Sequence, residues 1–210
     1  MFINRLVKNE LVSNTTILLT GTILAQALPL AISPILTRLY TPAEFGTYAL
    51  FIGLLSIISV VATLRYELAV MQPRCNVDAV NLVVLSIVVG VFMSAITFIV
   101  VVIFEDRLVE TLGSPAIRKW IWWVPASVFL MACFQSLNYW CNRTKQYKMI
   151  ATAKVTQSTA MSAVNLGAAS ASHSAFGLIA GHLIGQFVAV CTLLRRVGFG
   201  EAKLFNLNRM

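Results

Sequence analysis

Charged side chains lie inside long apolar stretches of this sequence. Arg65 and Glu67 are near the end of one stretch, and Lys154 is in another. A charge at the depth of a lipid bilayer costs several kcal/mol unless it faces water, protein or the membrane interface. On a helix, Glu67 shares a face with Ser56 and Thr63, which favours a protein or cavity environment for its carboxylate.

Arg65 allows two interpretations. On a helix it points about 200° away from Glu67, so the two residues do not form a simple ion pair. Arg65 shares its face with the apolar residues Leu54, Ile58 and Val61. Its long side chain can therefore extend to the membrane interface, or its guanidinium can serve a binding site inside the protein.

Two apolar stretches also carry polar residues along one helical face. In the first stretch these are Thr15, Thr22, Gln26, Ser33 and Thr37. In the fifth stretch the corresponding face has Lys154, Ser158, Ser162, Asn165, Ala169 and Ser172. Two polar faces on separate helices predict a shared, hydrated cavity. The alternative is helix–helix packing through small hydroxylated residues, which is common in membranes.

The last apolar stretch contains a glycine repeat, Gly177, Gly181 and Gly185. Glycines at this spacing let a neighbouring helix approach closely, and the Ala-rich fifth stretch is the expected partner. His182 and Gln186 lie one turn apart beside this face. They are either a proton-linked pair, which makes His182 a candidate for ion coupling, or a hydrogen-bonded contact between helices.

The composition excludes a soluble domain. Of 210 residues, 58% are hydrophobic and 11% charged, and the mean hydropathy is +0.81. The net charge of +8 does not indicate nucleic-acid binding, because the basic residues fall in short loops between apolar stretches. The four cysteines have neither paired spacing nor neighbouring histidines, so we expect no metal site, no cofactor and no disulfide framework.

The apolar stretches predict an all-α integral membrane protein with six spans, at about 14–39, 45–71, 79–104, 120–141, 151–172 and 175–194. Residues 1–13 are predicted to form an amphipathic helix on the membrane surface, and residues 195–210 a basic cytoplasmic tail. The loops on one side carry most of the Lys and Arg residues, which places both termini in the cytoplasm.

Three segments of the sequence carry a family resemblance. They read TPAEFG (41–46), LRYELAV (64–70), and YWCNRTKQYK followed by KVTQS (139–148 and 154–158). Together, and in this order, they resemble the bacterial polysaccharide (O-antigen type) flippases of the MATE-like superfamily. The resemblance covers essentially the whole chain.

This resemblance implies an inner-membrane protein that moves an undecaprenyl-pyrophosphate-linked oligosaccharide to the periplasmic leaflet. In the family, a cavity with basic residues between two lobes receives the headgroup. Arg65 and Lys154 are then candidates for the pyrophosphate, and Thr22, Gln26 and Ser33 for sugar hydroxyls. Ser162, Asn165 and Glu67 complete the candidate cavity, and Glu67 and His182 are candidates for ion coupling.

The sequence departs from the family in length, because flippases have twelve or more spans and six are predicted here. We therefore expect one lobe, either as part of a truncated protein or as half of a parallel homodimer. A non-transporting subunit that partners a polysaccharide polymerase and a related MATE-like exporter are alternatives. A transferase acting on polyprenyl phosphate fits less well, since no acidic or metal-binding motif is present, and we expect no enzyme activity.

Overall fold

The computed structural model describes residues 2–60, 62–73, 75–171 and 174–201, and every regular element in these ranges is a helix. The helices are α1 (Phe2–Leu39), α2 (Pro42–Ser59), α3 (Tyr66–Ala69), α4 (Asn76–Thr111), the short 3-10 helices η1 (Pro115–Lys119) and η2 (Ile121–Trp123), α5 (Val124–Arg143), α6 (Tyr147–Ala171) and α7 (Phe176–Glu201). The predicted all-α class is confirmed for this part of the chain.

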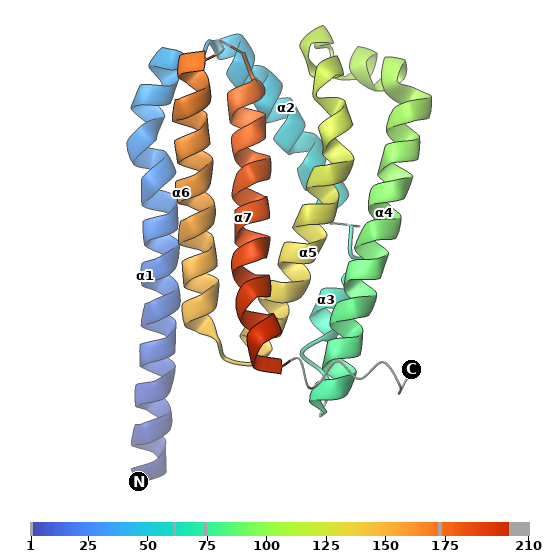
Figure 1. Ribbon diagram of the computed structural model, residues 1–210. Coiled ribbons are helices and arrows are strands. Elements are labelled where there is room, and N and C mark those ends of the chain that lie inside the picture. Colours follow the sequence, from blue (N-terminus) through green and yellow to red (C-terminus); the bar gives the residue numbers. More distant parts are fainter. Residues whose placement is uncertain (1, 61, 74, 172–173, 202–210) are drawn as a thin grey trace.

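The long helices form an elongated bundle (Figure 1). Helices α1, α6 and α7 stand side by side, α4 and α5 form the opposite side, and α2 crosses the bundle obliquely. The start of α1 and the end of α7 lie at the same end of the bundle, which we call the terminal end. The α1–α2 turn and η1 lie at the opposite end, which we call the far end.

Five of the described helical segments are long and apolar enough to cross a membrane, so the chain is a multi-pass membrane protein. They are Thr15–Leu39, Pro42–Ser59, Asn76–Thr111, Ile121–Arg143 and Phe176–Arg195. The predicted span at 151–172 is not among them, although α6 has 25 residues. Its many Ala, Ser and Thr residues lower its hydropathy, and α6 lies between α1 and α7 (Figure 1).

The predicted second span, 45–71, is not one continuous helix. Helix α2 begins with a capping box, in which Thr41 and Glu44 satisfy each other's backbone N–H groups, and it ends at Ser59. Leu64 and Arg65 then adopt left-handed backbone angles, with φ of 47° and 62°. This conformation is unfavourable for L-residues and incompatible with a right-handed helix. The expected angle between Arg65 and Glu67 therefore does not apply.

Other predicted boundaries shift less. The third span extends to both sides as α4, and the fourth begins as the 3-10 helices before α5. Residues 2–13 continue into α1 without a break, so no turn separates the predicted surface helix from the first span. Of the predicted tail, residues 195–201 belong to α7, and 202–210 lie outside the described residues.

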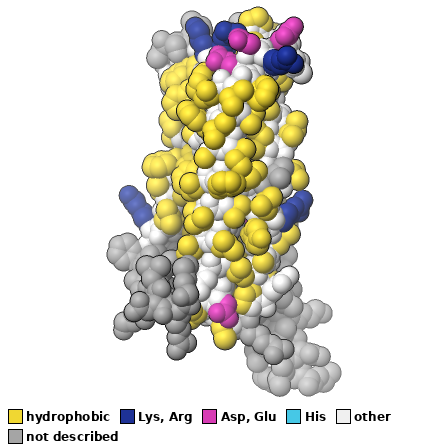
Figure 2. All heavy atoms as spheres, turned by 90° about the vertical axis from the view of Figure 1, so that its right-hand side faces the viewer, with side chains coloured by type: hydrophobic (Ala, Val, Ile, Leu, Met, Phe, Trp, Pro, Cys, Tyr) yellow, Lys and Arg dark blue, Asp and Glu magenta, His cyan; other side chains and the backbone are white. Residues whose placement is uncertain are grey.

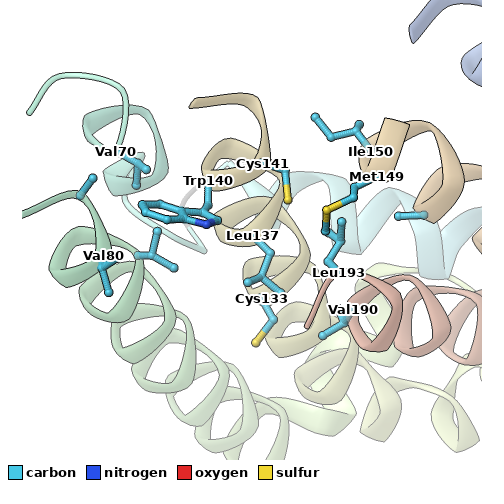
Figure 3. Close-up of a cluster of buried hydrophobic side chains, with 13 residues drawn as sticks. Val70, Val80, Cys133, Leu137, Trp140, Cys141, Met149, Ile150, Val190 and Leu193 are labelled. Atoms are coloured by element: carbon cyan, nitrogen blue, oxygen red, sulfur yellow. The ribbon is translucent and has the colours of Figure 1, made fainter. Parts of the chain in front are cut away.

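Apolar side chains fill the bundle and also cover much of its outside. One buried cluster includes Trp140 and Leu137 of α5, Val80 of α4, Val190 of α7, and Val70, which directly follows α3 (Figure 3). On the outer face of α4, large side chains are exposed, among them Val88, Phe92, Ile99 and Ile103. Figure 2 shows this face as mostly hydrophobic, with many of the charged side chains at the top of the view and others at its flanks and near the bottom. Lipid is the natural solvent for such a surface.

Candidate functional site

A groove of about 540 Å³ lies between α1 and α6, and we call it the α1–α6 groove. Its lining residues are Thr22, Ala25, Gln26, Pro29, Leu30, Phe134, Lys154, Gln157 and Ser158. Three of the predicted site residues, Thr22, Gln26 and Lys154, are thus brought together. Lys154 lies about 10 Å along α6 from its first residue, at 1.5 Å per residue, so the groove lies well within the length of the bundle.

Two close contacts hold α1 and α6 beside this groove. A methyl group added to Gly21 would lie 2.4 Å from the Cβ of Ala151, so the two helices are too close there for any residue larger than glycine. The hydroxyl of Ser158 donates a hydrogen bond to the carbonyl oxygen of Ala25. These contacts fix the lateral position of the polar side chains that line the groove.

The groove combines a cation with neutral polar groups. The ammonium of Lys154 is a mobile point charge suited to phosphate oxygens. The amides of Gln26 and Gln157 and the hydroxyl of Thr22 can donate and accept hydrogen bonds. Among the described residues no group of three or more His, Cys, Asp or Glu side chains could hold a metal ion. Lys154 and the neutral groups beside it are suited to binding an anionic ligand that carries hydroxyl groups.

Helix α6 also packs tightly against α7, as the glycine repeat predicts. A methyl group on Gly181 would lie 1.9 Å from the amide end of Asn165 and 3.0 Å from the carbonyl oxygen of Met161. One on Gly185 would lie 2.9 Å from the carbonyl oxygen of Gln157. The prediction that the fifth stretch is the partner of the glycine repeat is confirmed.

Asn165 and Ser162 are buried and are not lining residues of the groove. With its amide nitrogen facing α7, Asn165 donates hydrogen bonds to the carbonyl oxygens of Gly177 (3.0 Å) and Met161 (3.1 Å). The hydroxyl of Tyr40 donates to the backbone oxygen of Asn165 at 2.7 Å. For Asn165, the structure favours the alternative of helix packing over the predicted cavity.

Ser33 and His182 also lie apart from the groove. Ser33 is exposed on α1, beyond the lining residues. His182 is half-buried, and its ring meets the ring of Phe51 edge-on, with centroids 6.5 Å apart. Near it on α7, Gln186 is buried, and its Oε1 has no hydrogen-bond partner in the described part of the chain.

Arg65 and Glu67 occupy the interruption between α2 and α3 and do not line the groove. Arg65 is exposed. Glu67 is only 5% exposed, and no hydrogen-bond partner of its Oε2 is found among the described residues. Burial of an unpartnered carboxylate oxygen is costly, so Glu67 is the most unusual buried polar residue in this region.

Arg143, one of the basic residues near the ends of the predicted spans, has a specific position in the structure. It donates hydrogen bonds to the carbonyl oxygens of Val70 (3.0 Å) and Pro73 (2.7 Å). Arg143 therefore ties the end of α5 to the connection between α3 and α4. The sequence carries no local signal for this contact, because the residues are about seventy positions apart.

A second cavity, of about 570 Å³, lies at the far end and was also missed. We call it the far-end pocket. It lies between the start of α2, η1 and the start of α7, and its polar and aromatic lining residues are Glu44, Thr47, Lys119, Trp120, Ser174 and Phe176. Only the TPAEFG segment (41–46) marked this region in the sequence.

Comparison with known proteins gives one match, to a family profile. Neither a curated protein nor a solved structure matches the chain. The profile of a family described as polysaccharide biosynthesis protein matches residues 35–209, which is well over half of the chain. The chain therefore belongs to the polysaccharide biosynthesis protein family.

Proposed function

We propose that the protein is a flippase that moves an undecaprenyl-pyrophosphate-linked oligosaccharide across the bacterial inner membrane, for O-antigen or another surface polysaccharide. Family membership supports a role in polysaccharide biosynthesis, and the apolar helices support a place in the membrane. The observation that supports transport in particular is the α1–α6 groove. It presents Lys154 and neutral polar groups beside membrane-spanning helices.

In this proposal the groove replaces water around the headgroup. A pyrophosphate cannot enter hydrocarbon without losing its hydration, and Lys154 offers a compensating charge. The amides of Gln26 and Gln157 offer partners for sugar hydroxyls. The lipid tail stays in the bilayer, beside the apolar residues Pro29 and Leu30. Arg65 has no part in this binding step, because it does not line the groove.

We further propose that the bundle is one lobe of a two-lobe, MATE-like transporter that works by alternating access. In this arrangement α6 crosses the membrane as a sixth span, and both termini are cytoplasmic. The second lobe is a second copy of the chain or a further segment. Gln26 and Ser33 of α1 are exposed at the surface, and a second lobe on that side would remove them from lipid.

Glu67 is our candidate for ion coupling, because it is buried with an unpartnered oxygen beside a helix interruption. Glu67→Gln keeps the shape of the side chain but cannot exchange a proton. We expect this variant to insert normally and to lose the dependence of transport on a proton gradient. Glu110→Gln, at an exposed position of α4, is the control. Unchanged gradient dependence in Glu67→Gln would remove Glu67 from coupling, and His182→Gln would then be tested in the same way.

The flippase proposal is tested with the purified chain in proteoliposomes that contain a fluorescent undecaprenyl-pyrophosphate oligosaccharide. A membrane-impermeant glycosidase cleaves only headgroups on the outer leaflet. We expect cleavage to exceed half of the labelled lipid when the protein is present, because inner-leaflet headgroups become accessible. Protein-free liposomes set the baseline, and a dye-retention measurement excludes leakage.

Other outcomes identify the alternatives. Cleavage that stays at the baseline, together with copurification of a polymerase, would indicate a non-transporting assembly subunit. Transport of a drug-like cation but not of the lipid would indicate a related exporter. Transfer of a sugar or phosphosugar by the purified protein would indicate an enzyme, and would contradict the proposal.

A further inference from the structure

Two aromatic side chains of the far-end pocket, Trp120 and Phe176, lie close together. The rings of Trp120 and Phe176 have their centroids 5.9 Å apart, with a tilt of 36° between their planes. Trp120 also packs against the buried cluster of α2, α5 and α7. Trp122 and Trp123 are 42% and 46% exposed, much like Phe176 at 44%, but they do not line the pocket.

Besides apolar residues, the lining of the pocket includes three polar side chains that are held by hydrogen bonds, Glu44, Thr47 and Ser174. The Oε2 of Glu44 accepts hydrogen bonds from the backbone N–H and the hydroxyl of Thr41, at 2.7 and 2.9 Å. Thr47 is buried, and its hydroxyl donates to the carbonyl oxygen of Ala43 at 3.0 Å. Ser174 accepts a hydrogen bond from the backbone of Phe176 at 3.2 Å. The pocket is thus lined by aromatic rings and by a carboxylate held in place by the chain's own hydrogen bonds.

Lys119 adds a cation at the end of η1, where its side chain is exposed. With Glu44, it gives the pocket charges of both signs, whereas no acidic residue lines the α1–α6 groove. A fixed carboxylate repels a pyrophosphate. The far-end pocket is therefore poorly suited to the anionic part of the substrate and better suited to a neutral, hydroxyl-rich part.

We propose that the far-end pocket is a binding subsite for the neutral sugar rings of the oligosaccharide. The apolar face of a sugar ring would pack on Trp120 and Phe176, while its hydroxyls would bond to Glu44 and Lys119. The volume of about 570 Å³ lies within the range of about 300–1,000 Å³ common for small-ligand pockets. This inference rests on the proposed function and assigns the pocket to the end of the bundle opposite to the termini.

Binding of the free sugar tests the subsite without transport. The probe is the oligosaccharide released by mild acid from the polyprenyl-linked pool of the source cells, so that it lacks pyrophosphate and lipid. Tryptophan emission and calorimetry report its binding to the full chain in detergent. We expect Trp120→Leu to weaken binding by about tenfold, the effect of losing one ring contact of roughly 1.4 kcal/mol.

Trp122→Leu is the matched control, because it removes an exposed tryptophan from the same end of the bundle. Lys119→Gln is a second test that leaves the buried cluster untouched, and we expect a smaller loss of binding. An equal effect of Trp120→Leu and Trp122→Leu, or no binding by the wild-type chain, would overturn the inference. Competition by inorganic pyrophosphate would also overturn it, since that result would indicate an anion site.

The two proposals can fail separately. If the lipid-linked oligosaccharide is not moved in proteoliposomes but the released sugar binds with the expected dependence on Trp120, the flippase proposal fails and the subsite stands. If transport is observed and Trp120→Leu binds the sugar as tightly as Trp122→Leu, the subsite fails and the flippase proposal stands.

Discussion

Helix α6 meets α7 at backbone distance, whereas beside α1 it leaves a groove. On the α7 side, Gly181 and Gly185 lie so close to α6 that added methyl groups would collide with it. On the α1 side, close contact is made at Gly21, and long side chains such as Gln26 and Lys154 stand around open space. Lys154 at the groove and Asn165 at the α7 contact share one polar stripe of α6, so polarity alone does not distinguish a packing contact from a site.

The number of glycines on the neighbouring helix makes the difference, since α7 has Gly177, Gly181 and Gly185 along the contact and α1 has Gly21 alone. Glycine lets two helices approach until small polar groups bond to the facing backbone, as Asn165 does with Gly177. Long polar side chains do not fit between two helices that are so close, and they remain at the edge of a groove. The following substitutions test this contrast between the two faces of α6.

The largest effect is expected on the packed face. Gly181→Ala places a methyl group against Asn165 and the backbone of Met161, and overpacking of this kind typically destabilises by about 1–3 kcal/mol. We expect a lower unfolding temperature in detergent and a loss of monodisperse protein. Gly53→Ala is the control, since nothing lies within 4 Å of a methyl group at that position. Equal stability of the two variants would show that α6 and α7 are not closely packed.

On the groove face we expect a loss of transport without a loss of stability. Lys154→Gln removes the charge, and a hydrogen bond to a charged group contributes about 1.5–3 kcal/mol, so the transport rate should fall by about ten- to a hundredfold. The proteoliposome assay measures the rate, and thermal unfolding checks the fold. Lys148→Gln, at an exposed position of the same helix, should transport normally. A similar loss in both variants would point to a general charge effect rather than to the groove.

A smaller effect is expected where Tyr40 meets α6. Tyr40→Phe removes the hydrogen bond to the backbone oxygen of Asn165, and we expect a loss of stability of about 1 kcal/mol. Chemical denaturation in detergent measures this loss. Tyr66→Phe, at an exposed position, should have the stability of the wild type. If Tyr40→Phe lowers transport more than stability, the packed face also takes part in the transport step.

The smallest effect is expected at Ser33. This residue continues the polar face of α1 but does not line the groove, so Ser33→Ala should change neither transport nor stability by more than about 0.5 kcal/mol. Thr22→Ala, which alters the groove itself, should transport more slowly in the same assay. A transport defect in Ser33→Ala would extend the binding site along α1 toward the far end.

Part of the candidate site could be predicted because it depends on local periodicity. Thr22 and Gln26 are four residues apart on one helix, and Lys154 and Ser158 are four apart on another, so each pair shares a face whatever the rest of the fold. The same pattern placed Asn165 and Ser162 with them, but Asn165 lies in the contact with α7. Periodicity identifies a polar face but not the helix that covers it.

By itself, the sequence determined that this chain is an all-helical membrane protein and that the glycine repeat packs against the fifth stretch. Hydropathy and residue spacing depend only on the residue types and their order, so they can be read from the sequence alone. Only the tertiary structure decided where α2 is interrupted, what Arg143 binds and which residues form the far-end pocket. Leu64 and Arg65 are neither glycine nor proline, so their residue types do not predict left-handed backbone angles. Arg143 and the pocket join residues far apart in the chain, and such contacts arise only when the helices pack.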